Sequence, residues 1–147
     1  FVGRRQEHIA FTATTSMQLR EASAGDEAGL TVYMLEPAHY DLFVKQLADG
    51  KQAVVLRYRL GELTHIEKEV VLPQSRVQLR VKGSSEIYSF EYATDGKNFK
   101  ELGRMNTQYI STETAGGFTG IMLGMYAVSS SDVSKAYADF EYFDYEK

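Results

Sequence analysis

The feature that most constrains the fold is a series of short segments in which apolar and polar residues alternate. The clearest is Val77-Gln78-Leu79-Arg80-Val81-Lys82, apolar at every odd position and polar at every even one. A period of two places all the apolar side chains on one face of an extended strand. Similar segments follow one another along the chain, separated by turn residues at roughly eight- to twelve-residue intervals, and none keeps a helical apolar period over three turns.

These segments predict about ten to twelve strands. Asp49-Gly50 and Asp95-Gly96 are expected to form hairpin turns, because Gly readily takes the positive φ that a tight turn needs. Many short strands at this spacing predict an all-β fold, a two-sheet antiparallel β-sandwich of the jelly-roll type. No linker or repeat divides residues 1–147, so a single domain is expected. The expected strands cover residues 8–19, 27–35, 39–45, 54–60, 66–72, 77–82, 88–92 and 99–102, with further strands in the tail.

Charge and composition exclude several kinds of partner. The formal net charge is -4 and the Lys and Arg residues are not gathered into a stripe, so nucleic acid is not expected as a ligand. No apolar run reaches the length of a membrane span. The chain has no Cys, which excludes disulfides and thiolate metal sites.

Catalytic groups are not evident in the sequence. His8, His39 and His65 lie in different segments, and no nucleophile-elbow motif accompanies any Ser. We expect each His to make a local hydrogen bond on a strand or turn. Glycoside hydrolysis needs two carboxyl groups on one face, but Glu141 and Asp144 are three apart in a strand and face opposite sides. Glu67 and Glu69 share a face, on what we interpret as a solvated strand.

Two binding functions stay open from the residues alone. Asp26, Glu27 and Asp139 have the hard oxygen ligands that calcium prefers, although solvated turn acids and an outward-facing Asp are the simpler explanation. Exposed aromatic rings could stack on sugars. The ten Tyr residues offer candidates and there is no Trp, but in a Tyr-rich sandwich most rings belong to the core.

A glycine-dense segment near the C-terminus carries one large aromatic residue. It reads Ala115-Gly116-Gly117-Phe118-Thr119-Gly120 and leads into an apolar strand. Such a backbone can approach another surface closely. Phe118 is therefore either a core residue after a turn or a ring presented outward.

Several motifs, taken in order, resemble the C-terminal domain of family 43 glycoside hydrolases. These β-xylosidases and α-L-arabinofuranosidases carry a concanavalin A-like β-sandwich behind a five-bladed propeller. The resemblance covers nearly the whole chain. Its motifs are Gly3-Arg4-Arg5-Gln6, Glu27-Ala28-Gly29-Leu30, His39-Tyr40, residues 92–103 with Asp95-Gly96 at their centre, Gly117-Phe118-Thr119-Gly120, Gly124-Met125-Tyr126, and Ala138-Asp139-Phe140-Glu141-Tyr142-Phe143.

The resemblance implies that the catalytic carboxylates lie in the propeller and that this chain alone is not an enzyme. In that family a loop of the sandwich places a Phe at the rim of the catalytic pocket, and the matching residue here is Phe118. Arg4 and Arg5 are expected at an interface or sheet edge. Phe99 stands where such domains often have Trp, which removes one possible stacking ring.

We therefore expect a non-catalytic accessory domain, the C-terminal fragment of a larger glycoside hydrolase. It would stabilise the upstream propeller and complete its pocket for xylan- or arabinoxylan-type oligosaccharides. The resemblance also implies a bacterial protein that is periplasmic or extracellular. Two alternatives stay open: a free-standing carbohydrate-binding module that uses a Tyr-lined concave sheet, and a structural domain that binds protein. No cofactor is expected, with calcium at Asp26, Glu27 and Asp139 left open.

Overall fold

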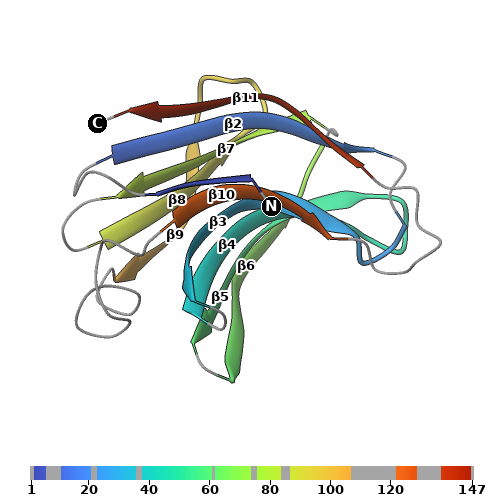
Figure 1. Ribbon diagram of the computed structural model, residues 1–147. Coiled ribbons are helices and arrows are strands. Elements are labelled where there is room, and N and C mark those ends of the chain that lie inside the picture. Colours follow the sequence, from blue (N-terminus) through green and yellow to red (C-terminus); the bar gives the residue numbers. More distant parts are fainter. Residues whose placement is uncertain are drawn as a thin grey trace.

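The computed structural model describes residues 2–5, 11–20, 23–35, 38–60, 62–73, 76–83, 87–106, 122–128 and 137–146. Within them eleven strands form two stacked antiparallel sheets (Figure 1). Among these residues there is no helix with the length and apolarity of a bilayer span. The strands are β1 (Val2–Arg5), β2 (Phe11–Arg20), β3 (Glu27–Leu35), β4 (Ala38–Gln46), β5 (Gln52–Leu60), β6 (Leu63–Val71), β7 (Arg76–Gly83), β8 (Ile87–Ala93), β9 (Lys100–Asn106), β10 (Met122–Val128) and β11 (Tyr137–Glu146).

Each sheet combines strands from distant parts of the chain. The six-stranded sheet has the order β1-β10-β3-β4-β5-β6, and the five-stranded sheet has the order β11-β2-β7-β8-β9. The strands of the six-stranded sheet bend through a pronounced arc (Figure 1). This architecture confirms the predicted all-β sandwich.

The core lies between the two sheets and follows the alternation of the sequence. Val77, Leu79 and Val81 are buried, as their period of two predicts. From the other sheet the even-numbered residues of β3, β4 and β5 point inward. The buried core residues are Ala13, Met17, Leu19, Ala28, Leu30, Val32, Tyr40, Leu42, Val44, Val54, Leu56, Leu72, Val77, Leu79, Val81, Tyr88, Phe90, Tyr92 and Leu102.

Both predicted hairpin turns are confirmed. Gly50 and Gly96 have φ of 86° and 77°, and each turn joins two strands that pair with each other, β4 with β5 and β8 with β9. The expected division between the strands at residues 27–35 and 39–45 is confirmed, because β3 ends at Leu35 and β4 begins at Ala38.

Two expectations need correction. Residues 1–7 carry no strand prediction, yet Val2–Arg5 is the edge strand β1, paired with β10. Glu67 and Glu69 do not share a face. A β-bulge skips Glu67 in the pairing of β5 with β6, so Glu67 accepts a hydrogen bond from the core-side Tyr58 while Glu69 lies opposite Val55. Both residues are nevertheless exposed, as expected for a solvated strand.

Candidate functional site

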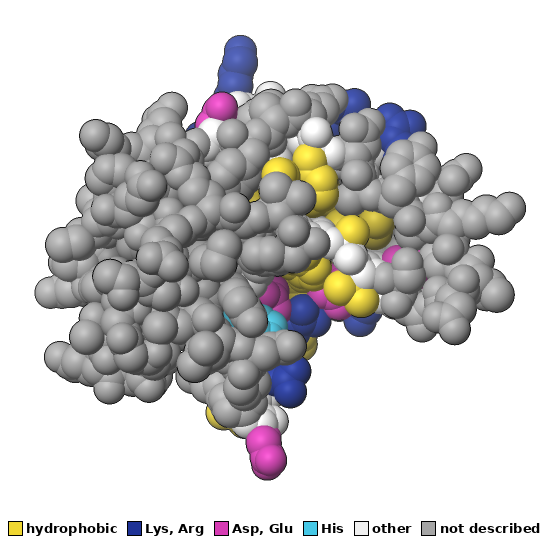
Figure 2. Space-filling view, in the orientation of Figure 1, with side chains coloured by type: hydrophobic (Ala, Val, Ile, Leu, Met, Phe, Trp, Pro, Cys, Tyr) yellow, Lys and Arg dark blue, Asp and Glu magenta, His cyan; other side chains and the backbone are white. Residues whose placement is uncertain are grey.

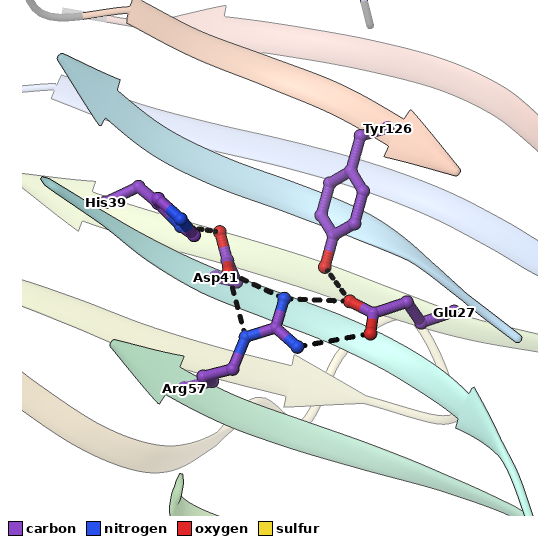
Figure 3. A network of polar contacts seen from close by, with 5 residues as sticks. All are labelled: Glu27, His39, Asp41, Arg57 and Tyr126. Atoms are coloured by element: carbon purple, nitrogen blue, oxygen red, sulfur yellow. Dashed lines mark hydrogen bonds and ion pairs between the residues drawn. The ribbon is translucent and has the colours of Figure 1, made fainter. Parts of the chain in front are cut away.

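The most organised group of polar side chains lies on the outer face of the six-stranded sheet. It consists of Glu27 on β3, His39 and Asp41 on β4, Arg57 on β5 and Tyr126 on β10 (Figure 3). Each alternates along its strand with core residues, so the period of two directs these side chains away from the core. We call these five residues the outer-face network. The space-filling view shows acidic, basic and imidazole groups together near the middle of one face, with hydrophobic side chains beside them (Figure 2).

Arg57 is the centre of this network. Its Nη1 and Nη2 donate to Glu27 Oε1 and Oε2 at 3.1 and 2.8 Å, a bidentate pair across β4. Its Nε and Nη2 both donate to Asp41 Oδ2, at 3.0 and 2.8 Å. Asp41 lies directly opposite Arg57 in the ladder between β4 and β5. One guanidinium is therefore paired with two carboxylates from two other strands.

Two further residues complete the network at its ends. The hydroxyl of Tyr126 donates to Glu27 Oε2 at 2.7 Å, which ties β10 to β3 through side chains. His39 Nδ1 lies 2.8 Å from Asp41 Oδ1. The two carboxylates thus each have a partner besides Arg57.

The aromatic ring of Phe43 lies beneath the guanidinium of Arg57. The Cζ atom of Arg57 is 4.4 Å from the ring centroid of Phe43, and the Phe43 and Tyr126 centroids are 6.5 Å apart. Phe43 points away from the main core yet is 1% exposed, in a second small cluster with Ala53 and Val55. This cation–π contact and the surrounding apolar groups keep the network poorly solvated.

Burial and pairing shift the pKa values of three residues in the network. Burial alone would raise the pKa of Asp41, but hydrogen bonds and charge from His39, with hydrogen bonds from Thr31 and Arg57, outweigh it and lower that pKa. Burial would lower the pKa of Arg57, whereas Glu27 and Asp41 raise it. Burial and the charges of Asp41 and Glu27 raise the pKa of Tyr126 well above its ordinary value. Asp41 and Arg57 are therefore charged, and Tyr126 is neutral, over the physiological range.

This arrangement does not suit acid–base catalysis. A glycosidase acid needs a carboxyl group whose pKa is raised. Asp41 has the opposite shift, and both oxygens of Glu27 are occupied by Arg57. The network is suited to holding strands together and to presenting a preorganised polar surface.

The calcium candidates belong to three different elements of the chain. Asp26 is buried in a turn, where its Oδ2 accepts a hydrogen bond from the Ser23 backbone. Glu27 belongs to the outer-face network. Asp139 lies on β11 of the other sheet, opposite Gln18. In the part of the chain that the structure describes, no group of three His, Cys, Asp or Glu is placed to hold a metal ion.

Other predicted residues have the following positions. Phe118 lies outside the described residues. Arg4 and Arg5 are on β1 at the edge of the six-stranded sheet, opposite Leu123 and Met122. His39 makes the local contact expected of it, and His65 lies 3.2 Å from Glu67. Tyr40, Tyr88 and Tyr92 are core residues, so these rings do not line an exposed face.

The alternation over residues 54–60 directs Arg57 outward but does not reveal its partners. The signal was present in part, because a hairpin centred near Asp49-Gly50 fixes the register that sets Asp41 opposite Arg57. The contribution of Tyr126 was not accessible, since it depends on the pairing of β10 with β3.

Comparisons with known proteins cover the whole chain. A family model described as "Beta xylosidase C-terminal Concanavalin A-like domain" matches residues 1–146. A non-reducing end α-L-arabinofuranosidase of Bacteroides ovatus is 31% identical over 146 residues, which are 99% of this chain and 27% of the relative. A xylosidase/arabinosidase of Humicola insolens is 29% identical over 157 residues, covering 98% of this chain and 29% of the relative.

Solved structures agree with the fold. The chain superposes on the Bacteroides ovatus protein described as "Xyloglucan PUL GH43B" with a TM-score of 0.87 and 30% identity, over 98% of this chain and 28% of that one. A xylan β-1,4-xylosidase from Bacillus halodurans shares the fold with a TM-score of 0.86 at 22% identity, over 99% of this chain and 29% of that one. The chain therefore spans a little more than a quarter of the proteins that it resembles.

Proposed function

Because the chain belongs to the family of β-xylosidase C-terminal concanavalin A-like domains, we propose that it is a non-catalytic accessory domain of a family 43 glycoside hydrolase. Its role is to stabilise the catalytic propeller and to complete the substrate pocket with Phe118. The substrates are xylan- or arabinoxylan-type oligosaccharides.

One observation carries the proposal. The family match takes in residues 1–146, yet the chain spans only 27% to 29% of its curated relatives. The names of those relatives describe arabinofuranosidase and xylosidase activities. The remaining part of such an enzyme is large enough to contain the catalytic domain.

The outer-face network supports a non-catalytic role. Both of its carboxylates are paired with Arg57, and the pKa of Asp41 is lowered, whereas a glycosidase acid needs a raised pKa. The described Tyr residues also favour the accessory role over a Tyr-lined sugar platform, because Tyr40 and Tyr88 are fully buried in the core.

The test is Phe118→Ala in the full-length enzyme, assayed with p-nitrophenyl β-D-xyloside and p-nitrophenyl α-L-arabinofuranoside. We expect kcat/KM to fall at least severalfold, with the melting temperature nearly unchanged. Phe99→Ala is the matched control, since Phe99 directly precedes β9 and its ring stacks on Arg80 of β7, both strands of the five-stranded sheet. Loss of stability with unchanged kinetics would identify Phe118 as a core residue and reject its role in the pocket.

A separate titration addresses the isolated chain. We expect no heat of binding with xylo- or arabinoxylo-oligosaccharides, because the proposed sugar contact needs the rest of the pocket. Binding in the micromolar range would instead identify a carbohydrate-binding module.

A further inference from the structure

The two outer faces of the sandwich differ in how they meet solvent. The outer face of the five-stranded sheet carries ordinary surface ion pairs. Glu101 accepts hydrogen bonds from Ser89 and Arg104, both at 2.7 Å, and Lys82 lies 3.7 Å from Glu91. Such exposed pairs are typical of a face that stays in water.

The outer face of the six-stranded sheet is less well solvated. The side chains of Asp41, Glu27 and Arg57 are 3%, 16% and 22% exposed, above a buried Phe43. Exposed aliphatic residues lie on both sides of this network. Val128 is 55% exposed opposite Glu27, and Ile66 is 48% exposed opposite Arg57. Val71, 53% exposed, lies opposite Ala53.

These features together describe an interaction surface. Exposed aliphatic residues beside ion-paired, poorly solvated charges fit a surface that another protein covers, because paired charge costs less to bury than unpaired charge. A sugar-binding face would instead offer an exposed ring, and Phe43, the ring beneath Arg57, is covered.

The topology indicates which partner meets this surface. A domain that precedes a C-terminal domain joins it at its first strand, and β1 is an edge strand of this same sheet. The adjoining strand, β10, follows the glycine-rich segment that contains Phe118. The link from a preceding domain and the segment that contains Phe118 therefore both lead into neighbouring strands, β1 and β10, at one edge of the six-stranded sheet.

We propose that the outer face of the six-stranded sheet, centred on the outer-face network and flanked by Ile66, Val71 and Val128, docks against the catalytic domain of the same polypeptide. This inference rests on the proposed function and adds the surface through which the accessory domain acts. The network provides a rigid centre whose charged groups are paired with one another, and the aliphatic residues provide the area that association buries.

The first test is the double variant Ile66→Lys/Val128→Lys in the full-length enzyme. Both side chains are about half exposed in the isolated chain, so its own melting temperature should not change. In the full-length enzyme the half-life of activity at elevated temperature should fall severalfold, because two charges would be buried at the interface. Ile87→Lys is the matched control, an aliphatic residue 37% exposed on β8 of the other sheet.

A second measurement needs no variant. Lys45 lies on the proposed surface, opposite Glu27, whereas Lys82 belongs to the opposite sheet. Acetylation of Lys45 should be severalfold slower in the full-length enzyme than in the isolated chain, and that of Lys82 equally fast in both. The inference is overturned if acetylation slows equally at both lysines in the full-length enzyme, or if it slows at neither.

The outcomes separate this inference from the proposed function. If Phe118→Ala lowers kcat/KM while the double variant behaves like Ile87→Lys, the docking surface is wrong and the accessory role stands. If neither Phe118→Ala nor the double variant has an effect, both the proposed function and the docking surface are rejected. If the isolated chain binds oligosaccharide and the double variant abolishes it, the face is a glycan site and the docking inference is overturned.

Discussion

Arg57 and Glu27 form a bidentate ion pair across an intervening strand, with both terminal nitrogens of the guanidinium on the two carboxylate oxygens at 3.1 and 2.8 Å. The same guanidinium binds Asp41, so the three side chains join β3, β4 and β5 on the face opposite the core.

Replacement of Arg57 by Ala should be strongly destabilising. It leaves Asp41, which is 3% exposed, without its cation and uncovers the ring of Phe43. We expect the free energy of unfolding of the isolated chain to fall by about 3 kcal/mol in urea denaturation. Arg104→Ala is the control, because Arg104 pairs with Glu101 on the solvated face and its loss should leave the midpoint almost unchanged. Equal shifts in the two variants would contradict a special role for Arg57.

Removal of the Tyr126 hydroxyl tests the link between β10 and β3. In Tyr126→Phe the hydrogen bond to Glu27 is lost while the ring stays beside Phe43. The expected loss of stability is about 1.5 kcal/mol, since the acceptor is charged. In the double variant Tyr126→Phe/Glu27→Gln, the loss of stability should be smaller than the sum of the losses in the two single variants, because the two residues are coupled. Strict additivity would show that the contact contributes nothing.

The pH dependence of stability should show the ionisation of Asp41. Its pKa in the folded chain lies below its ordinary value of 3.8, so the unfolded chain takes up this proton first as the pH falls. The stabilisation by this group is complete above that ordinary value and is lost as the pH falls through the folded pKa. Carbon-detected NMR titration of the Asp41 carboxyl should give a midpoint below 3.8, and a midpoint at or above it would refute this account.

Two Gly→Ala substitutions should differ sharply. A Cβ at Gly29 would lie 2.2 Å from the Leu42 carbonyl oxygen and 2.5 Å from the Phe43 Cα, both of them backbone atoms that cannot yield. Gly29→Ala should therefore separate β3 from β4 and give little soluble folded protein. Gly50→Ala meets no atom within 4 Å, and only its φ of +86° is unfavourable. That variant should fold with a loss of about 1 kcal/mol, measured by thermal unfolding.

Local patterns in the sequence predicted most of the fold. Alternation identified the buried face of β7, and Asp-Gly pairs located two hairpins, because both depend on residues close together in the chain. Alternation does not reveal which distant strands are neighbours. The short edge strand β1 and the insertion of β10 between β1 and β3 were therefore missed. The same limit explains why the contact between Glu27 and Tyr126 was not predicted.

The faces of β6 were mispredicted for a second reason. The bulge at Glu67 reverses the expected alternation of β6, and no turn residue marks it in the sequence. The resemblance to family 43 enzymes, in contrast, drew on motifs along the whole chain, and the match over residues 1–146 confirms it.

The position of β10 has a consequence for the time course of folding. Glu27 and Tyr126 are 99 residues apart, so the edge of β3 that faces β10 stays unpaired until most of the chain has been synthesised. Contacts at such separation close slowly, and an open strand edge can pair with other chains in the meantime. During synthesis the six-stranded sheet is thus incomplete for longest on the side where β1, β10 and β3 meet, and a chaperone that shields that edge would raise the yield of folded protein.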